Sequence, residues 1–235
     1  MNDYSSYRRQ EILQKVQGAG FRPLDVMVTG VTGAGKSTTL NSLFKKTVAE
    51  VGSGTDPMTM ELDSYSLNDA VRFWDTPGLG DGISRDAQHS RKLIDLLWKT
   101  YSFDGERNVY GFIDLALIII DGSTRDMGTV YRLINDIVIP NIQHDRVIVA
   151  INQADMAMSG RHWDSSANAP DGTLRKFLGE KSLSVRQRIE EATGVRVPVP
   201  ICYSAERDYN MTALIDLITS AIPDSRRELM GHSSS

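Results

Sequence analysis

Short apolar runs alternate with stretches of helical periodicity along most of the chain. Residues 24–28, 115–120 and 147–151 are continuous apolar runs rich in β-branched side chains, which is typical of strands buried on both faces. Apolar residues three and four positions apart predict helices at Val130, Leu133, Ile134 and Ile137, and again at Met211, Leu214, Ile215 and Ile218. Strands that alternate with helices predict an α/β fold, with a mostly parallel sheet covered on both faces.

Further elements complete the sheet. Residues 60–67 and 71–74 flank Asn68-Asp69, which predicts a hairpin that adds one antiparallel edge strand. Residues 197–203 predict a last strand with an irregular start, because Pro198 and Pro200 cannot donate to a ladder. We therefore expect three layers around a six-stranded sheet.

Two helices and their boundaries follow from local signals. Residues 4–17 predict a helix before the first strand, and residues 37–45 predict another directly after it. Asn210 is in the position of an N-cap for the last helix. Residues 156–173 are polar and rich in turn formers, and are interpreted as a loop insertion.

Composition narrows the classes of protein. The chain has 235 residues, with 40% hydrophobic and 24% charged residues, which excludes a disordered chain and a fibrous one. Its formal net charge is −4, so nucleic-acid binding is unsupported. A single cysteine, Cys202, excludes an intrachain disulfide. The run 115–120 is far shorter than the ~20 residues that span a bilayer. We expect a cytoplasmic protein without an integral membrane segment.

The glycine-rich stretch after the first strand indicates a phosphate site. Residues 30–37, GVTGAGKS, fit G-x-x-x-x-G-K-[ST] between a predicted strand and a predicted helix. Glycines let successive N–H groups converge on phosphate oxygens, and the helix directs its positive end at them. Lys36 would reach the β- and γ-phosphates, and the Ser37 hydroxyl would ligate Mg²⁺. The expected phosphate-binding residues are Gly33, Ala34, Gly35, Lys36, Ser37 and Thr38.

An acidic residue follows the strand 71–74. Asp75-Thr76-Pro77-Gly78 alone is typical of a turn. After a phosphate-binding loop, however, an acid at the end of a neighbouring strand is where a Mg²⁺ ligand is expected. Asp75 is therefore a candidate metal ligand, and the Gly78 N–H is a candidate donor to the γ-phosphate.

Two further motifs indicate which base would bind. Asp155 follows the strand 147–151, and its carboxylate can accept hydrogen bonds from guanine N1–H and N2–H₂, a pair of donors that adenine lacks. The Ala205 N–H, after the last strand, could meet guanine O6. Because adenine lacks the pair of donors that Asp155 would accept from, Asp155 disfavours an ATPase. The expected base-binding residues are Asn152, Gln153, Asp155, Ser204, Ala205 and Glu206.

Four motifs in order, GVTGAGKS, DTPG, NQAD and SAE, resemble the guanine-nucleotide-binding domain of the translation-factor-type P-loop GTPases. DTPGLGD and VGSGTDPMT look most like the Era and septin branch, and closest to bacterial, often prophage-borne, Era-like predicted GTPases. The resemblance implies a GTPase domain over residues 23–222, preceded by a helical extension (1–22) and followed by a flexible tail (223–235). The family usually has lysines where Gln153 and Glu206 stand, which affects base stacking rather than the choice of guanine.

The resemblance also implies a Mg²⁺-dependent switch that hydrolyses GTP to GDP and phosphate. The family needs a threonine in the loop before the edge strand, as a metal ligand and sensor of the γ-phosphate; we prefer Thr59 over Thr55. The expected catalytic residues are Lys36, Thr59, Asp75 and Gly78, and the expected metal ligands are Ser37, Thr59 and Asp75.

One part of the hydrolytic machinery is missing from the motifs. The Ras type has a water-orienting glutamine directly after the glycine of D-x-x-G, and here Leu79 takes that place. We therefore expect slow intrinsic turnover that an activating protein or a second copy accelerates. Asp81 and Arg85, in the loop after DTPG, and Arg125 are candidate helpers, although surface charges are usually only solvated.

Other interpretations stay open. The chain could be a septin-like, self-assembling structural protein, or an inactive nucleotide-binding scaffold, since NQAD and SAE depart from the family pattern. Trp163 in the polar insertion would either anchor a partner or fix the insertion to its own domain.

Overall fold

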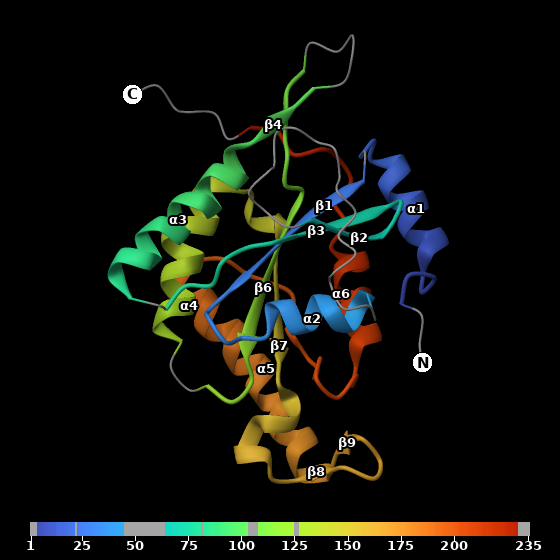
Figure 1. Cartoon of the computed structure of the whole chain (residues 1–235), viewed down its shortest axis with the longest axis vertical. Coiled ribbons are helices and arrows are strands. Elements are labelled where there is room, and N and C mark those ends of the chain that lie inside the picture. The colour runs from blue at the N-terminus through green and yellow to red at the C-terminus, as the bar shows by residue number, and fades with distance from the viewer. Residues whose placement is uncertain are drawn as a thin grey trace.

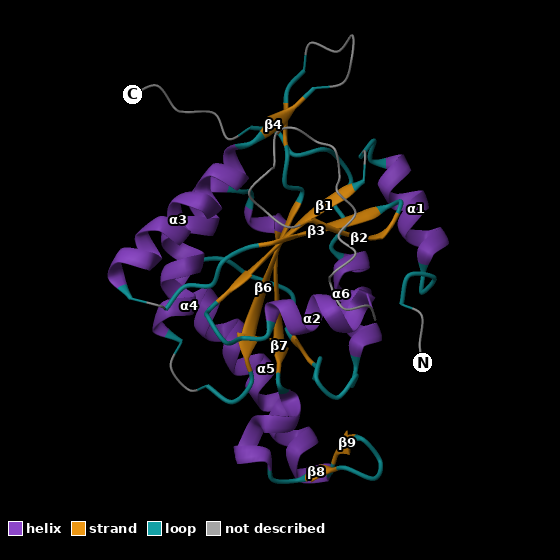
Figure 2. Cartoon of the chain, viewed as in Figure 1, coloured by secondary structure: helices purple, strands orange, loops and turns teal. Residues whose placement is uncertain are grey.

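A computed structural model describes residues 4–21, 23–44, 64–80, 82–102, 108–124 and 127–229. A six-stranded sheet runs through the molecule, with helices on both sides (Figure 1, Figure 2). Its strands are β1 (Leu24–Gly30), β2 (Ser64–Asn68), β3 (Val71–Asp75), β6 (Leu115–Asp121), β7 (Val147–Asn152) and β10 (Ile201–Cys202). The order is β10-β7-β6-β1-β3-β2, and all neighbours are parallel except β2 and β3. The predicted α/β class, with one antiparallel edge strand, is confirmed.

Helices cover both faces of this sheet. They are α1 (Arg9–Gly18), α2 (Lys36–Phe44), α3 (Ile83–Trp98), α4 (Gly128–Arg132), α5 (Gly172–Thr193) and α6 (Met211–Ser220). Side chains of α1, α2 and α6 pack in one apolar cluster, and those of α3, α4 and α5 pack in another. A π-helical turn, Leu133–Val138, continues α4. The two clusters are separated by the sheet, whose inner strands β1 and β7 are buried along their whole length.

Shorter elements join the main ones. Two small hairpins pair β4 (Thr100–Tyr101) with β5 (Tyr110–Gly111), and β8 (Trp163–Asp164) with β9 (Ala169–Pro170). The 3-10 turns are Ile139–Asn141, His144–Arg146 and Ala154–Gly160. The predicted loop insertion 156–173 therefore contains the β8–β9 hairpin, which lies at the lower end of Figure 1.

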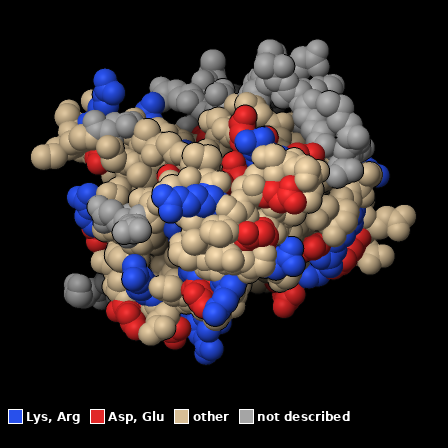
Figure 3. Space-filling view, turned by 90° about the horizontal axis from the view of Figure 1, so that it is seen from below, with Lys and Arg blue, Asp and Glu red and all other residues tan. Residues whose placement is uncertain are grey.

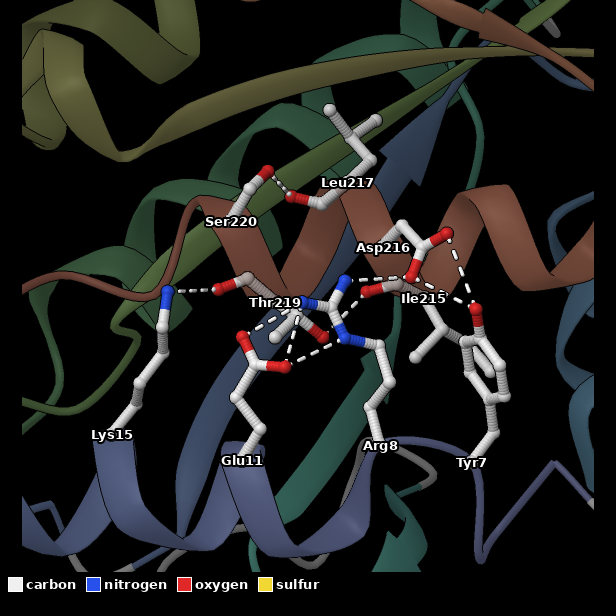
Figure 4. Close-up of polar contacts among 9 residues, drawn as sticks. All are labelled: Tyr7, Arg8, Glu11, Lys15, Ile215, Asp216, Leu217, Thr219 and Ser220. Carbon is white, nitrogen blue, oxygen red and sulfur yellow. Dashed lines mark hydrogen bonds and ion pairs between the residues drawn. The ribbon is translucent and has the colours of Figure 1, made fainter.

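The N-terminal helix is part of the core. Ile12 and Val16 are 1% and 2% exposed and belong to the cluster on the α6 side of the sheet. Polar contacts flank this apolar face (Figure 4): Arg8 pairs with Asp216 at 2.7 Å, and Lys15 Nζ donates to the Thr219 carbonyl at 3.0 Å. The helix begins at Arg9, five residues later than predicted, and its contacts tie the expected extension to α6.

Two helices differ from the expected pattern. Arg85 lies on α3, exposed, and not in a loop after DTPG. The apolar face of α3 is confined to its second half, at Leu93, Leu96 and Leu97, so periodicity gave no sign of its start. Helix α5 was not predicted because Ser182 takes one of its buried positions and a polar stretch precedes it.

The last strand and the last helix also differ from prediction. The pairing with β7 begins only at Ile201, because Pro198 and Pro200 precede it and supply no N–H. Asn210 does not cap α6 with its side chain; its Nδ2 donates to the Cys202 carbonyl at 2.8 Å instead.

Part of the predicted flexible tail is docked. Arg227 is 2% exposed; its Nη1 donates to the Asn141 carbonyl at 2.9 Å, and its carbonyl accepts from Gly111 N at 2.9 Å. Arg226 Nε donates to the Gly20 carbonyl at 2.6 Å. Residues 223–229 therefore close the end of the sheet where β1 begins. Among the described residues, the structure contains no helix with the combined length and hydrophobicity that a bilayer span requires.

Candidate functional site

The carboxyl ends of the parallel strands meet at one edge of the sheet, and the predicted motifs gather there. The loop 30–37 curls between β1 and α2. Gly35 has φ +83°, and a Cβ at this position would lie 2.2 Å from Asn152 Nδ2. Only glycine therefore lets the loop approach the end of β7 this closely.

Lysine, serine and aspartate meet at the phosphate end. Lys36 is 8% exposed, and its Nζ lies 3.2 Å from the Val31 carbonyl, so the amine is held across its own loop. Ser37 Oγ donates to Asp75 Oδ2 at 3.1 Å. The two predicted metal ligands that the structure describes are thus adjacent oxygen donors, which is the ligand chemistry that Mg²⁺ prefers. Thr59 and Thr55 lie outside the described residues.

The DTPG segment packs directly on the phosphate loop. Leu79 N donates to the Gly30 carbonyl at 3.3 Å, and Thr32 N donates to the Leu79 carbonyl at 2.8 Å. A Cβ on Gly78 would come within 2.7 Å of both Lys36 Nζ and Thr32 N. Gly78 is thus close enough to the lysine for both to meet one phosphate group.

Leu79 and the first turns of α3 hold this segment in place. Leu79 is 4% exposed and packs in the apolar cluster below the loop, so it cannot orient water. His89 Nδ1 lies 2.6 Å from the Gly78 carbonyl, and Gly80 N donates to Asp86 Oδ1 at 2.8 Å. Of the predicted helpers, Arg85 is exposed on α3, while Asp81 and Arg125 fall outside the described residues.

Asn152 joins three motifs. Its Nδ2 donates to the Ala34 carbonyl at 3.0 Å, and its Oδ1 accepts from Ala205 N at 3.0 Å. Ala205 N–H is therefore bonded within the protein, where we expected it to face guanine O6. Gln153, in the left-handed conformation, donates from Nε2 to the Gly33 carbonyl at 2.9 Å. The side chain that replaces the usual lysine thus still anchors this motif to the phosphate loop.

Asp155 is 6% exposed and lines a cavity of about 440 Å³ beside the phosphate loop. Its Oδ1 is buried and has no hydrogen-bond partner among the described residues. A buried carboxylate oxygen without a donor is costly. A ligand edge with two adjacent N–H donors would remove that cost, and guanine presents such an edge.

Most predicted binding residues line this one cavity: Gly33, Gly35, Thr38, Asn152, Gln153, Asp155 and Glu206. Ala34, Ser204 and Ala205 are buried behind its wall, and support it through their backbone and hydroxyl groups. Met156 and Arg207 also line it and were missed, although each directly follows a motif that was recognised.

The insertion packs against the end of the cavity that Asp155 and Arg207 line, called the base end below. The ring of Trp163 meets that of Tyr209 edge-on at 5.1 Å, and Tyr209 pairs with Ser204 through two backbone hydrogen bonds. Asn168 Nδ2 donates to the Arg207 carbonyl at 2.7 Å. Of the two interpretations of Trp163, the structure favours the one in which it fixes the insertion to its own domain.

Comparison with known proteins identifies a matching family and several relatives. The model of the 50S ribosome-binding GTPase family matches residues 25–153, more than half of the chain. The chain is 27% identical to translocase of chloroplast 132 of Arabidopsis thaliana over 206 residues, which cover 81% of the chain but only 16% of that protein. It is also 27% identical to the probable GTP-binding protein EngB of Geobacillus kaustophilus, over 68% of the chain and 76% of that protein.

Among solved structures, Toc33 of Arabidopsis thaliana in complex with GDP and Mg²⁺ has a TM-score of 0.62 at 15% identity, covering 96% of this chain and 94% of its own. A further structure, from work on atToc33 and psToc159 whose stated finding is that dimerization is important for the GTPase activity of these chloroplast translocon components, has a TM-score of 0.65 at 16% identity. It covers 97% of this chain and 94% of its own. Identities this low show a shared fold.

Proposed function

Because the chain belongs to the 50S ribosome-binding GTPase family, we propose that it binds GTP and GDP with Mg²⁺ and hydrolyses GTP to GDP and phosphate. The observation that carries this proposal is Asp155, which lines the cavity beside the phosphate loop and whose buried Oδ1 has no hydrogen-bond partner among the described residues. Guanine N1–H and N2–H₂ would satisfy it, and adenine would not.

The residues around the phosphate loop supply the other parts of the mechanism. Lys36 would neutralise the charge of the β- and γ-phosphates, and the backbone N–H groups of the loop would hold their oxygens. The Gly78 N–H would meet the γ-phosphate. Ser37 and Asp75, with Thr59 added, would hold Mg²⁺, which stabilises negative charge on the phosphates when it is bound.

Slow turnover belongs to the proposal. Leu79 is buried and leaves the usual water-orienting position without a polar group. A partner protein or a second copy would then supply the missing group, as the described dependence of GTPase activity on dimerization in Toc33 suggests for that protein. Placement beside Era, the septins or prophage-borne relatives is a finer proposal, supported only by DTPGLGD and VGSGTDPMT.

Competition binding tests the choice of base. A fluorescent GDP analogue bound to the protein should be displaced by GDP and GTP at concentrations far below those needed for ADP and ATP. Asp155→Ala should remove most of this preference, by roughly 100-fold, because two hydrogen bonds to a charged group are lost. Asp95→Ala, on the exposed side of α3 and away from the cavity, is the matched control and should keep it. An unchanged preference in Asp155→Ala would contradict the proposal.

A further inference from the structure

The base end of the cavity holds a cation that no motif assigns. Arg207 Nε lies 3.6 Å from Asp155 Oδ2, and the side chain of Arg207 is 50% exposed while that of Asp155 is 7% exposed. Both residues line the cavity. Arg207 thus forms an ion pair with the Asp155 carboxylate, while the rest of its side chain is exposed to the cavity and the solvent.

Other residues stand at the two positions where the family usually has lysine. Gln153 is neutral, and its Nε2 is bonded to the Gly33 carbonyl. Glu206 is exposed and carries the opposite charge. Among the described residues that line the cavity, Arg207 is the only cation. Without Arg207, no positively charged side chain among the residues that the structure describes would line the cavity beside a bound base.

We propose that Arg207 covers the purine ring of the bound nucleotide and replaces the missing lysines as the base-stacking residue. This rests on the proposed function, because it assigns the base-binding part of the same site. A guanidinium is planar and weakly hydrated, so it stacks well on an aromatic ring. Its pairing with Asp155 would keep the plane beside the carboxylate that reads the base edge.

The loop that carries Arg207 is braced by the two segments outside the core sheet. Arg207 N donates to Ser204 Oγ at 3.2 Å, and the Arg207 carbonyl accepts from Asn168 of the β8–β9 hairpin. On the other side, the Tyr4 hydroxyl donates to Asp208 Oδ1 at 2.6 Å. Asp208 has φ +52°, a conformation that needs such support. The insertion and the N-terminal segment therefore both hold the base-stacking residue in position.

Equilibrium binding of three ligands tests the proposal: GDP, IDP and pyrophosphate. In Arg207→Ala we expect GDP and IDP to bind about 5- to 30-fold more weakly, in parallel, because stacking does not depend on the N2 amine. Pyrophosphate binding should not change, since it uses only the phosphate loop. Arg196→Ala, an exposed arginine away from the cavity, is the control and should match wild type.

The sign of the change separates the proposal from its opposite. If Arg207 instead blocks Asp155 until the base arrives, Arg207→Ala will bind GDP more tightly, and the proposal is wrong. Unchanged GDP affinity, or equal loss of pyrophosphate binding, would also overturn it. If wild type binds ADP as tightly as GDP, both the proposed function and this inference are wrong. If wild type prefers GDP but Arg207→Ala binds GDP as tightly as wild type does, only this inference is wrong.

The hydrogen bond from Asn168 to the Arg207 carbonyl allows a second, independent variant. Asn168→Gly removes the hydrogen bond to the Arg207 carbonyl while tolerating the left-handed backbone at this position, φ +48°. It should weaken GDP and IDP binding about two- to tenfold, again without effect on pyrophosphate. Ser165→Gly in the same hairpin is the matched control, since Ser165 is exposed. A loss of GDP binding equal in both hairpin variants would point to general damage to the hairpin and would contradict a specific brace.

Discussion

One buried carboxyl lies far from the nucleotide site, where β1 and β6 begin. Asp114 is 1% exposed, and its Oδ2 accepts a hydrogen bond from Asp25 N at 2.9 Å. Burial raises the pKa of Asp114 to about 8, the nearby Asp25 charge adds to this, and Arg146 and Arg227 oppose it. The pKa of Arg227 falls to about 10 for the same reason, so it stays charged below that.

This carboxyl predicts a fall in stability with rising pH. The folded-state pKa lies above the unfolded value of about 3.9, so the folded protein binds an extra proton between these values. The contribution is fully present below pH 4 and is lost as pH rises to about 8, at no more than about 1.4 kcal/mol per pH unit. Urea denaturation from pH 5 to pH 8 measures it.

Asp114→Asn is the matched variant, because the amide keeps an acceptor for Asp25 N but cannot ionise. Its free energy of unfolding should change less over this pH range than that of wild type. Parallel pH profiles for the two proteins would show that Asp114 does not keep its proton in the folded state.

At the scale of elements, α1 is as much part of the domain as the strands are. Its apolar face enters the cluster beneath α6 through Ile12 and Val16, while Arg8 and Lys15 contact α6 from its rim. Tyr4, which precedes the helix, donates a hydrogen bond to Asp208 in the loop that carries Arg207, called the base loop below. Helix α1 therefore stabilises both the sheet and one wall of the cavity.

Ile12→Ala tests this at one buried position. The cavity left in the cluster should lower the free energy of unfolding by roughly 2–5 kcal/mol. Gln14→Ala, on the exposed side of the same helix, should change it little. Chemical denaturation followed by far-UV circular dichroism gives both values, and equal stabilities would mean that α1 is dispensable to the core.

At the scale of the whole molecule, the distribution of charge bears on how the proposed switch would meet a partner. Its net charge is −4, and on the face seen in Figure 3 basic and acidic side chains are interspersed, without one sign prevailing. Such a surface provides no long-range field for a polyanion. Contact surfaces near the DTPG segment are the natural place for an output, and Ile83, which begins α3 there, is 94% exposed.

Turnover is the prediction that belongs to this scale. The rate of single-turnover GTP hydrolysis should be slow in dilute protein. If a second copy supplies the missing water-orienting group, the rate per protein molecule should rise with protein concentration. Lys36→Ala provides the background, because it loses the charge on the β- and γ-phosphates. Fast hydrolysis that is independent of concentration and needs no partner would contradict this expectation.

Much of the candidate site could be predicted because its chemistry is local. A phosphate loop needs glycines, a lysine and a serine in fixed spacing, and an acid at a strand end needs only the strand before it. Seven predicted residues do line one cavity. Arg207 directly follows the recognised SAE motif, but its place at the cavity could not be predicted, because it depends on Asn168 and, through Asp208, on Tyr4, which are distant in sequence.

The hydrophobic pattern of the sequence determined the class of fold, since continuous β-branched runs are stable only when both faces of a sheet are covered. The sequence also determined which motif follows which strand. The tertiary structure decided what local patterns leave open: that α1 and residues 223–229 pack into the domain, that the insertion braces the base loop, and that Asn152 ties three motifs together. Each of these depends on contacts between segments far apart along the chain, and only folding brings their donors, acceptors and apolar surfaces within reach.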